Sequence, residues 1–236
     1  MAGPCQLIAM HGWAGDRRGW DPWIAAVAAK GWSWQSGERG YGQLPPAMPS
    51  WQLGEQGQSG GRRVLLVHSL GLHLLPAALL ADAEAVVLLA SFGRFVPEAA
   101  AGRRQRQALA AMAAQLRGET AETMLLNFYR LAADPEPVDP TTMGIGDQPL
   151  APAGLQRLEA DLKLLELCTG LPEAFPSQVP TLIVEAGRDQ IVAPQSQQLL
   201  RQALPAADLL RLGQSGHCLY GTPLVPMLLS WIDGLK

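Results

Sequence analysis

Short apolar runs alternate with segments of helical periodicity along this chain of 236 residues. Runs typical of strands lie at residues 6–10, 32–35, 64–68, 85–90, 181–185 and 208–212. Segments typical of helices lie at residues 22–30, 70–81, 105–117, 121–133, 154–167, 194–203 and 223–235. Parallel strands need a crossover connection, which is usually a helix. The alternation therefore predicts an α/β fold, with a mostly parallel sheet of about six strands flanked by helices.

The strand-like runs stop between residues 98 and 171, where alanine, leucine, arginine and glutamine recur at helical spacing. This all-helical block interrupts the alternation, which resumes after it. We interpret residues 98–171 as a helical cap, or lid, inserted into one α/β core made of residues 1–97 and 172–236. The length of the chain suits one substantial core and demands no second independent domain.

The composition excludes several classes of protein. Hydrophobic residues make up 48% and charged residues 17% of the chain, which fits a globular enzyme. No apolar stretch approaches the roughly 20 residues that span a bilayer, and no secretory signal pattern opens the chain. A net charge of −3 argues against nucleic-acid binding. We therefore expect a cytoplasmic protein, acting as a monomer, that binds neither membranes nor nucleic acid.

The three cysteines, Cys5, Cys168 and Cys218, form neither a zinc pattern nor a redox pair. We expect reduced thiols, no metal site and no cofactor.

A serine stands where a strand breaks sharply into a helix, at residues 63–71. A serine at such a corner projects its hydroxyl from the carboxyl edge of the sheet, where substrates bind in open α/β folds. Ser69 is therefore the candidate nucleophile. The usual G-x-S-x-G pattern has Val67 in place of its first glycine. A β-branched side chain crowds the tight turn, so the helix that follows would sit slightly further away.

A serine nucleophile needs a base to take its proton and an acid to orient that base. His217 follows the last predicted strand, and Asp189 follows the strand before it. The order Ser69, Asp189, His217, each after a different strand, is that of α/β-hydrolases. The other three histidines, His11, His68 and His73, are interpreted as structural, with the His68 side chain pointing away from Ser69.

The tetrahedral intermediate of acyl transfer carries a negative oxygen that needs preorganised backbone donors. One predicted donor is the N–H of Leu70, next to the serine. The second is the N–H of Trp13, in the loop of residues 11–15 after the first strand. The alternative interpretation of this loop is a plain glycine turn.

Arginine supplies 15 of the 18 basic residues, and six arginines face only three glutamates between residues 94 and 130. Residues 94–130 therefore carry a local charge of +3 in an acidic chain. Two interpretations stay open: a solvated helical face, or a docking surface for an acidic partner.

Over nearly its whole length the chain resembles the α/β-hydrolase superfamily. More narrowly, it resembles the esterases that cleave the methyl ester of pimeloyl-acyl carrier protein in biotin biosynthesis. The narrower resemblance rests on residues 11–13, 69–71, 127–130, 154–155 and 161–162, together with the helical cap.

The resemblance implies specific roles for residues of the cleft and the cap. The acyl chain would lie between them, in contact with Trp13, Leu70, Phe128, Tyr129 and Arg130. Cap arginines would bind the acidic acyl carrier protein; the candidates are Arg103, Arg104, Arg106, Arg117 and Arg130.

The function predicted from the sequence is that of a serine carboxylesterase, working through a Ser-His-Asp triad and an acyl-enzyme, with pimeloyl-acyl carrier protein methyl ester as its substrate. The alternative is a generic small-molecule carboxylesterase, or a carbon–carbon hydrolase or lyase of the same fold. A third hypothesis is a non-catalytic binding protein, because a fold does not fix a function.

Overall fold

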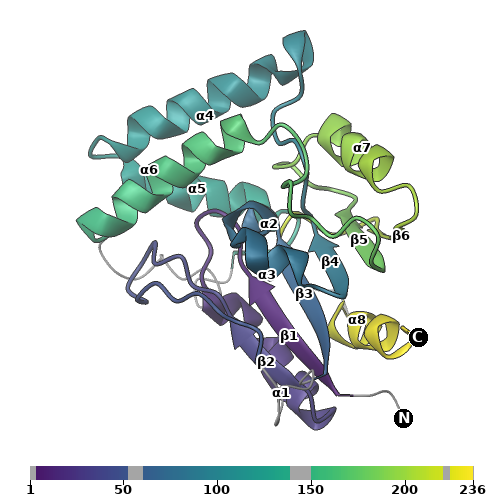
Figure 1. Cartoon of the computed structure of the whole chain (residues 1–236). Helices are drawn as coiled ribbons and strands as arrows, with labels where there is room; N and C mark the ends of the chain where they lie inside the picture. Colours follow the sequence, from purple (N-terminus) through teal and green to yellow (C-terminus); the bar gives the residue numbers. More distant parts are fainter. Residues whose placement is uncertain (1–3, 53–60, 139–149, 220–223, 236) are drawn as a thin grey trace.

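A six-stranded, all-parallel sheet forms the centre of the molecule in this computed structural model, which describes residues 4–52, 61–138, 150–219 and 224–235 (Figure 1). Its strands are β1 (Cys5–Met10), β2 (Ser33–Ser36), β3 (Arg62–His68), β4 (Ala85–Leu89), β5 (Thr181–Ala186) and β6 (Asp208–Leu212). Their order across the sheet is β2-β1-β3-β4-β5-β6. The predicted fold class, a parallel sheet of six strands between helices, is confirmed.

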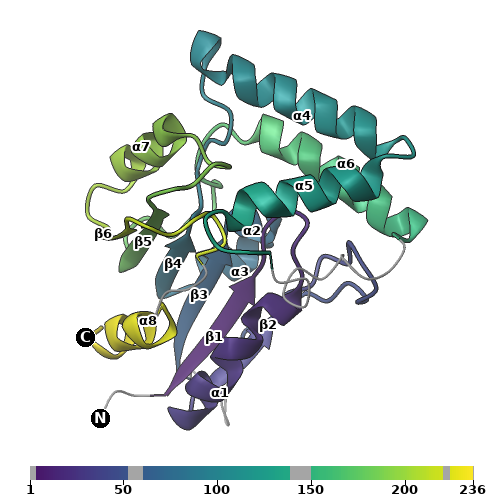
Figure 2. The same ribbon diagram turned by 180° about the vertical axis from the view of Figure 1, so that it is seen from behind.

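Each face of the sheet is covered by its own helices (Figures 1 and 2). Leu7 and Ala9 of β1 pack in one apolar cluster with residues of α1 (Asp21–Ala29) and α8 (Leu224–Asp233). Ile8 and Met10 pack in another, with residues of α2 (Gly71–Leu74), α3 (Ala77–Ala81) and α7 (Pro194–Ala203). Side chains alternate between the faces of a strand, and this alternation divides the core into two apolar layers.

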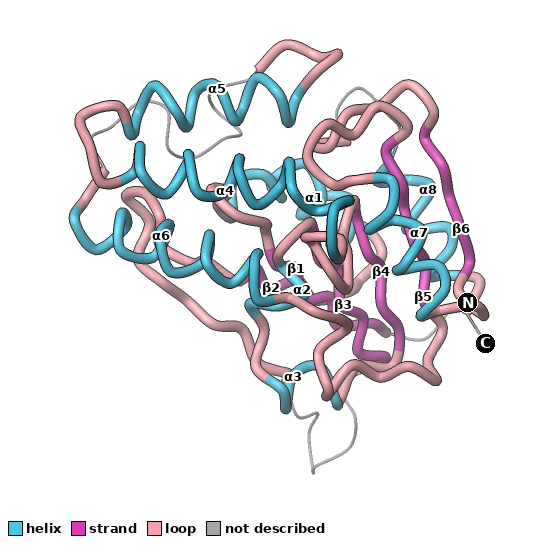
Figure 3. The backbone as a smooth tube through the Cα atoms, turned by 90° about the horizontal axis from the view of Figure 1, so that it is seen from above, coloured by secondary structure: helices cyan, strands magenta, loops and turns pink. Residues whose placement is uncertain are grey.

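Three helices lie over the carboxyl ends of the strands: α4 (Arg103–Leu116), α5 (Ala121–Ala133) and α6 (Pro152–Leu167). They come between β4 and β5 in the chain and lie beside one another (Figure 3). Leu109, Leu125 and Leu158, one from each helix, share a third apolar cluster with Trp13 of the core. The division into a core and a cap of residues 98–171 remains a prediction.

Two short 3-10 helices, η1 (Arg17–Trp20) and η3 (Ala99–Gly102), precede α1 and α4.

The prediction of one continuous helix over residues 70–81 is wrong. The structure has two short helices there, α2 and α3. Pro76 has no N–H to donate, and it disfavours helical geometry in the residue before it. Leu75 accordingly has extended backbone angles, φ −84° and ψ 143°. The first helix, α2, therefore ends at Leu74, one turn after it begins.

Val67 is accommodated as a core residue. Its side chain is fully buried, and it belongs to the same apolar cluster as Leu72 of α2. The first residue of that helix, Gly71, nevertheless lies close to β1, because a Cβ there would meet the Met10 carbonyl oxygen at 2.4 Å. Within the described ranges, no helix is both long and apolar enough to cross a membrane.

Candidate active site

Ser69 occupies a strained corner between β3 and α2. Its φ is 53°, in the left-handed region that non-glycine residues rarely adopt. Two hydrogen bonds hold this conformation: the Ser69 N–H donates to the Leu89 carbonyl at 2.9 Å, and the Ser91 hydroxyl donates to the Ser69 carbonyl at 2.8 Å. Strain of this kind persists where the surroundings enforce it, and it is concentrated at functional sites.

His217 and Asp189 form a buried pair. The His217 Nδ1 lies 2.9 Å from the Asp189 Oδ2, and both side chains are almost fully enclosed. The other carboxylate oxygen, Oδ1, accepts the N–H groups of Ile191 at 2.8 Å and Val192 at 2.9 Å.

Burial alone would raise the pKa of Asp189, but the charge and hydrogen bond of His217, together with these two N–H groups, lower it below its ordinary value. An ionised Asp189 accepts the Nδ1 proton and leaves Nε2 of His217 as the basic nitrogen.

Ser69 and His217 line one cavity of about 300 Å³, whose other walls are largely aromatic and aliphatic. In the described part of the chain, no hydrogen bond joins the Ser69 hydroxyl to the His217 ring. Catalytic hydrogen bonds are often long in unliganded enzymes and tighten when substrate binds. The structure therefore places Ser69, the predicted nucleophile, and His217, the predicted base, in one cavity, where their side chains are not hydrogen-bonded to each other.

A second cavity, of about 700 Å³, also has Ser69 in its wall. Residues of α4 and α5 and the segment 189–195 line it. Trp13, Ser69 and Phe128 belong to both cavities, and the Trp13 and Phe128 rings meet edge to face with centroids 4.9 Å apart. Ser69 thus stands at the boundary of two chambers.

The loop after β1 lies directly against the serine. A Cβ on Gly12 would be 2.8 Å from the Ser69 Cβ, so only glycine allows this approach. Trp13 and Leu70 are both buried, and neither backbone N–H has a hydrogen-bond partner within the described ranges. Buried backbone N–H groups are rarely left unpaired. Two of them beside one serine suit a site that receives an oxyanion.

His68 supports the loop that carries His217. Its Nε2–H donates to the His217 carbonyl at 2.9 Å, and the two rings lie 4.9 Å apart. Burial, and then the neighbouring His217, lowers the pKa of His68 to about 3. The sequence predicted a side chain pointing away from Ser69, whereas the His68 ring lines the same cavity as Ser69. A histidine held neutral here serves as a hydrogen-bond donor.

A His68→Gln variant should lose less stability in acid than the wild type. The folded pKa of His68, about 3, lies below its ordinary value of 6.5. As the pH falls below 6.5, the unfolded chain takes up this proton and the folded chain does not, so wild-type stability is lost. Glutamine keeps an N–H donor and does not titrate. Urea unfolding at pH 7 and at about pH 4.5 should show an extra wild-type loss of about 1–3 kcal/mol. Equal losses would contradict a neutral His68.

The residues predicted to contact substrate have different surroundings. Phe128 lines both cavities and Tyr129 lines the smaller one, where its hydroxyl donates to the Ala14 carbonyl at 2.9 Å. Leu70 is fully buried in the apolar cluster under the cap, and neither it nor Arg130 lines these two cavities. Arg130 is exposed and donates to the Asn127 side chain at 3.0 Å.

The predicted docking arginines fall into two groups. Arg106 donates to the backbone carbonyls of Pro97 and Ala99, and Arg117 forms an ion pair with Glu159. Arg103 and Arg104 are exposed in the first turn of α4 and have no ion pair among the described residues. Arg104 also lines the larger cavity.

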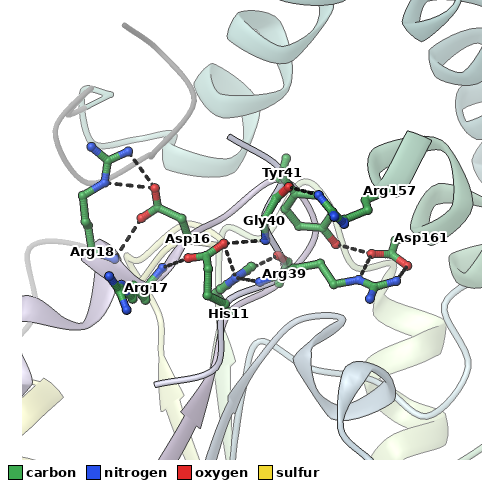
Figure 4. Close-up of polar contacts among 12 residues, drawn as sticks. His11, Asp16, Arg17, Arg18, Arg39, Gly40, Tyr41, Arg157 and Asp161 are labelled. Carbon is green, nitrogen blue, oxygen red and sulfur yellow. Dashed lines mark hydrogen bonds and ion pairs between the residues drawn. The ribbon is translucent and has the colours of Figure 1, made fainter. Parts of the chain in front are cut away.

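Sequence reasoning missed a buried polar cluster next to the loop after β1 (Figure 4). Glu38 and Arg39 lie between two predicted strands and outside every predicted site, and Asp161 lies in the predicted cap, marked only by the family resemblance. Both carboxylates are 2% exposed. No local signal in the sequence marks this cluster, because its members lie far apart along the chain.

No protein-family model matches the sequence, and no curated protein matches it significantly. Solved structures do match, at low identity. An esterase from Exiguobacterium antarcticum aligns with a TM-score of 0.74 and 14% identity over 99% of this chain and 94% of that one. The enol-lactonase from Burkholderia xenovorans aligns at 0.70 and 15%, over 98% and 90%. A thermophilic esterase from Thermogutta terrifontis aligns at 0.67 and 15%, over 97% and 89%.

The chain has the α/β-hydrolase fold. In this α/β-hydrolase arrangement, Ser69 directly follows β3, Asp189 follows β5 and His217 follows β6, so all three stand at the carboxyl edge of the sheet. Over the same described residues, no group of three or more histidine, cysteine or acidic side chains is placed to hold a metal ion. The resemblance to pimeloyl esterases remains a prediction, since these identities bear on the fold alone.

Proposed function

We propose that this protein is a serine hydrolase that cleaves carboxylic esters. The observation that carries the proposal is that all the groups needed for acyl transfer lie around Ser69. A strained serine and two unpartnered backbone N–H groups, those of Trp13 and Leu70, meet beside a cavity that also contains His217, paired with Asp189. Nucleophile, base, orienting acid and oxyanion donors are the parts that acyl transfer needs.

In the proposed mechanism, Ser69 Oγ attacks the ester carbonyl carbon and its proton passes to His217 Nε2. The N–H groups of Trp13 and Leu70 stabilise the negative oxygen that forms. Collapse of the intermediate breaks the bond to the alcohol, which leaves with the proton from Nε2. Water then gives a proton to Nε2 and attacks the acyl-enzyme. Collapse of this second intermediate releases the acid, and Nε2 returns the proton to Ser69 Oγ.

A fluorophosphonate probe tests the proposal without knowledge of the natural substrate. The probe should form one covalent adduct, located on Ser69 by peptide mass spectrometry. The adduct should form more slowly in the presence of a short acyl p-nitrophenyl ester, which competes for the same serine. An unlabelled, folded protein would favour the non-catalytic binding hypothesis instead.

Small carboxylic esters are the substrates that we favour. The fold is shared with two proteins named as esterases and one named as a lactonase. The two cavities that share Ser69 in their walls, of about 300 and 700 Å³, suit the two arms of a small ester. Carbon–carbon hydrolysis remains the alternative, because the same triad and oxyanion donors serve both reactions.

An ester carried by acyl carrier protein, including the pimeloyl methyl ester, is a second candidate. The exposed, unpaired arginines Arg103 and Arg104 favour it, because they stand at the start of α4 and Arg104 reaches the larger cavity. Complementary charge of this kind speeds association and makes it sensitive to salt.

Reversing both charges should separate the two candidates. We expect the double substitution Arg103→Glu and Arg104→Glu to lower kcat/KM on an acyl-carrier-protein ester by about 10-fold or more at low salt. Hydrolysis of p-nitrophenyl butyrate should change by less than about threefold and show no dependence on salt, because a neutral ester carries no charge for these arginines to attract. Arg106 is left unchanged, since it supports the backbone before α4. Equal losses on both esters would indicate a misfolded cap, and no loss on either would rule out docking at these arginines.

A further inference from the structure

The buried cluster around Glu38 and Asp161 ties the cap helix α6 to the loop that carries Trp13 (Figure 4). It has three parts: the loop after β1, the segment 38–41 that follows β2, and one face of α6. In sequence these parts are far apart, and the Arg39–Asp161 contact spans 122 positions.

His11, which begins the loop, is held by the segment 38–41. The Arg39 backbone N–H donates to His11 Nε2 at 3.1 Å, so the ring proton belongs on Nδ1, which lies 2.9 Å from the Gly12 carbonyl. Glu38 Oε1 lies 3.6 Å from the same Nε2 and accepts the Gly40 N–H at 2.7 Å. The position of His11, and hence of Gly12 and Trp13, depends on where this segment lies.

The carboxylate of Glu38 is charged although it is buried. Desolvation alone would raise its pKa, whereas the hydrogen bonds that its carboxylate accepts from the N–H groups of Arg17, at 2.9 Å, and Gly40, at 2.7 Å, favour the charged form and lower the pKa. A buried charge with this many donors fixes the backbone that provides them.

The segment is in turn held by α6. The Arg39 guanidinium donates to both oxygens of Asp161, at 2.5 and 2.7 Å, and the Tyr41 hydroxyl donates to one of them at 2.7 Å. Bidentate pairs of this type fix orientation as well as distance. Gly154 lets the helix come this close, because a Cβ there would lie 2.0 Å from the Tyr41 carbonyl oxygen.

The same helix also contacts the loop directly. The Trp13 indole N–H donates to the Leu158 carbonyl of α6 at 2.9 Å. The residue whose backbone N–H is a proposed oxyanion donor is therefore bound to α6 through its side chain, and to the same helix again through His11, Arg39 and Asp161.

We propose that Arg39 and Asp161 are positioning residues for the oxyanion site. The inference rests on the proposed function. It means that α6, a helix of the predicted cap, influences the rate of ester hydrolysis. Oxyanion donors act only within a narrow geometry, and the loss of one typically costs about 10²–10³-fold in kcat. A shift of Trp13 by a fraction of an ångström should therefore reduce the rate while leaving ground-state binding intact.

The test compares two acid-to-amide substitutions on the same helix. Asp161→Asn removes the negative charge that pairs with the Arg39 guanidinium and keeps the shape of the side chain. Glu159→Gln, two positions away, removes only the exposed ion pair with Arg117. The measurements are the fluorophosphonate labelling rate, the kcat and KM for p-nitrophenyl butyrate, and the affinity for a trifluoromethyl ketone, which forms the tetrahedral oxyanion.

We expect Asp161→Asn to lower kcat and the labelling rate by about 10–100-fold, with KM within about twofold and ketone affinity reduced in parallel. Glu159→Gln should behave as the wild type. Arg39→Lys, which keeps the charge but not the bidentate geometry, should fall between the wild type and Asp161→Asn. Circular dichroism at the assay temperature shows that each variant is folded.

The inference is overturned if folded Asp161→Asn labels and turns over like the wild type, or if Glu159→Gln loses as much. It is also overturned if the ketone affinity of Asp161→Asn is unchanged while kcat falls. Failure of the proposed function looks different, because then the wild type itself is neither labelled nor active.

Discussion

Ser69→Ala should abolish ester hydrolysis while the protein remains folded. Serine hydrolases that lose the nucleophile typically fall by about 10⁶-fold in kcat, to a residual rate that comes from binding and the oxyanion site. Alanine removes one buried oxygen and leaves the backbone of the corner in place. The measurement is the hydrolysis of p-nitrophenyl acetate and butyrate, with the unfolding midpoint recorded for each protein.

Ser91→Ala is the matched control. Its hydroxyl donates to the Ser69 carbonyl, so its loss weakens the support of the corner without removing the nucleophile. We expect at most about a 10-fold decrease in kcat and a loss of about 1–3 kcal/mol in stability, the cost of an unsatisfied buried carbonyl. Substantial turnover by Ser69→Ala would show that another group attacks the ester.

Asp189→Asn should reduce kcat by about 10³–10⁴-fold, because it fixes the wrong tautomer of His217. The N–H groups of Ile191 and Val192 both donate to Oδ1 of Asp189. In the variant, the amide oxygen has to face these two donors, which turns the NH₂ group toward His217 Nδ1. The ring then carries its proton on Nε2, where the proposed mechanism needs a base.

The comparison for this variant is Asp134→Asn, which changes an exposed carboxylate that accepts a hydrogen bond from Gln190 beside the same loop. Its kcat should stay within about twofold of the wild type. In the wild type, the lowered pKa of Asp189 keeps the carboxylate ionised until the pH falls below the ordinary value of 3.8. An Asp189→Asn variant as active as Asp134→Asn would remove Asp189 from the mechanism.

The alternation of apolar runs and helical segments was sufficient to predict the sheet, because each parallel strand requires a crossover. Ser69, Asp189 and His217 were also predictable, since residues that directly follow parallel strands meet at one edge. The Pro76 break could have been read from the sequence, as proline rarely continues a helix. The Arg39–Asp161 contact could not, because neither local spacing nor periodicity relates a turn after β2 to a helix of the cap.

The two cavities were equally beyond sequence reasoning. Their walls come from elements that are distant along the chain, and only the fold decides which side chains face the same empty space. Leu70 illustrates the limit: its backbone position next to Ser69 followed from the motif, whereas its side chain is enclosed in the apolar cluster under the cap and lines neither chamber.

The partition of the site by Trp13, Ser69 and Phe128 has a consequence for how selectivity can change. Under the proposed function, an ester that reacts at Ser69 would direct one arm into each chamber. The smaller chamber is bounded by η1, α1 and α8 and also by Phe128, Tyr129 and Ala132 of α5, whereas residues of α4 line only the larger chamber. Substitutions in the first turns of α4 would therefore alter the choice of the arm that enters the larger chamber and leave the smaller chamber, which α4 does not line, unchanged.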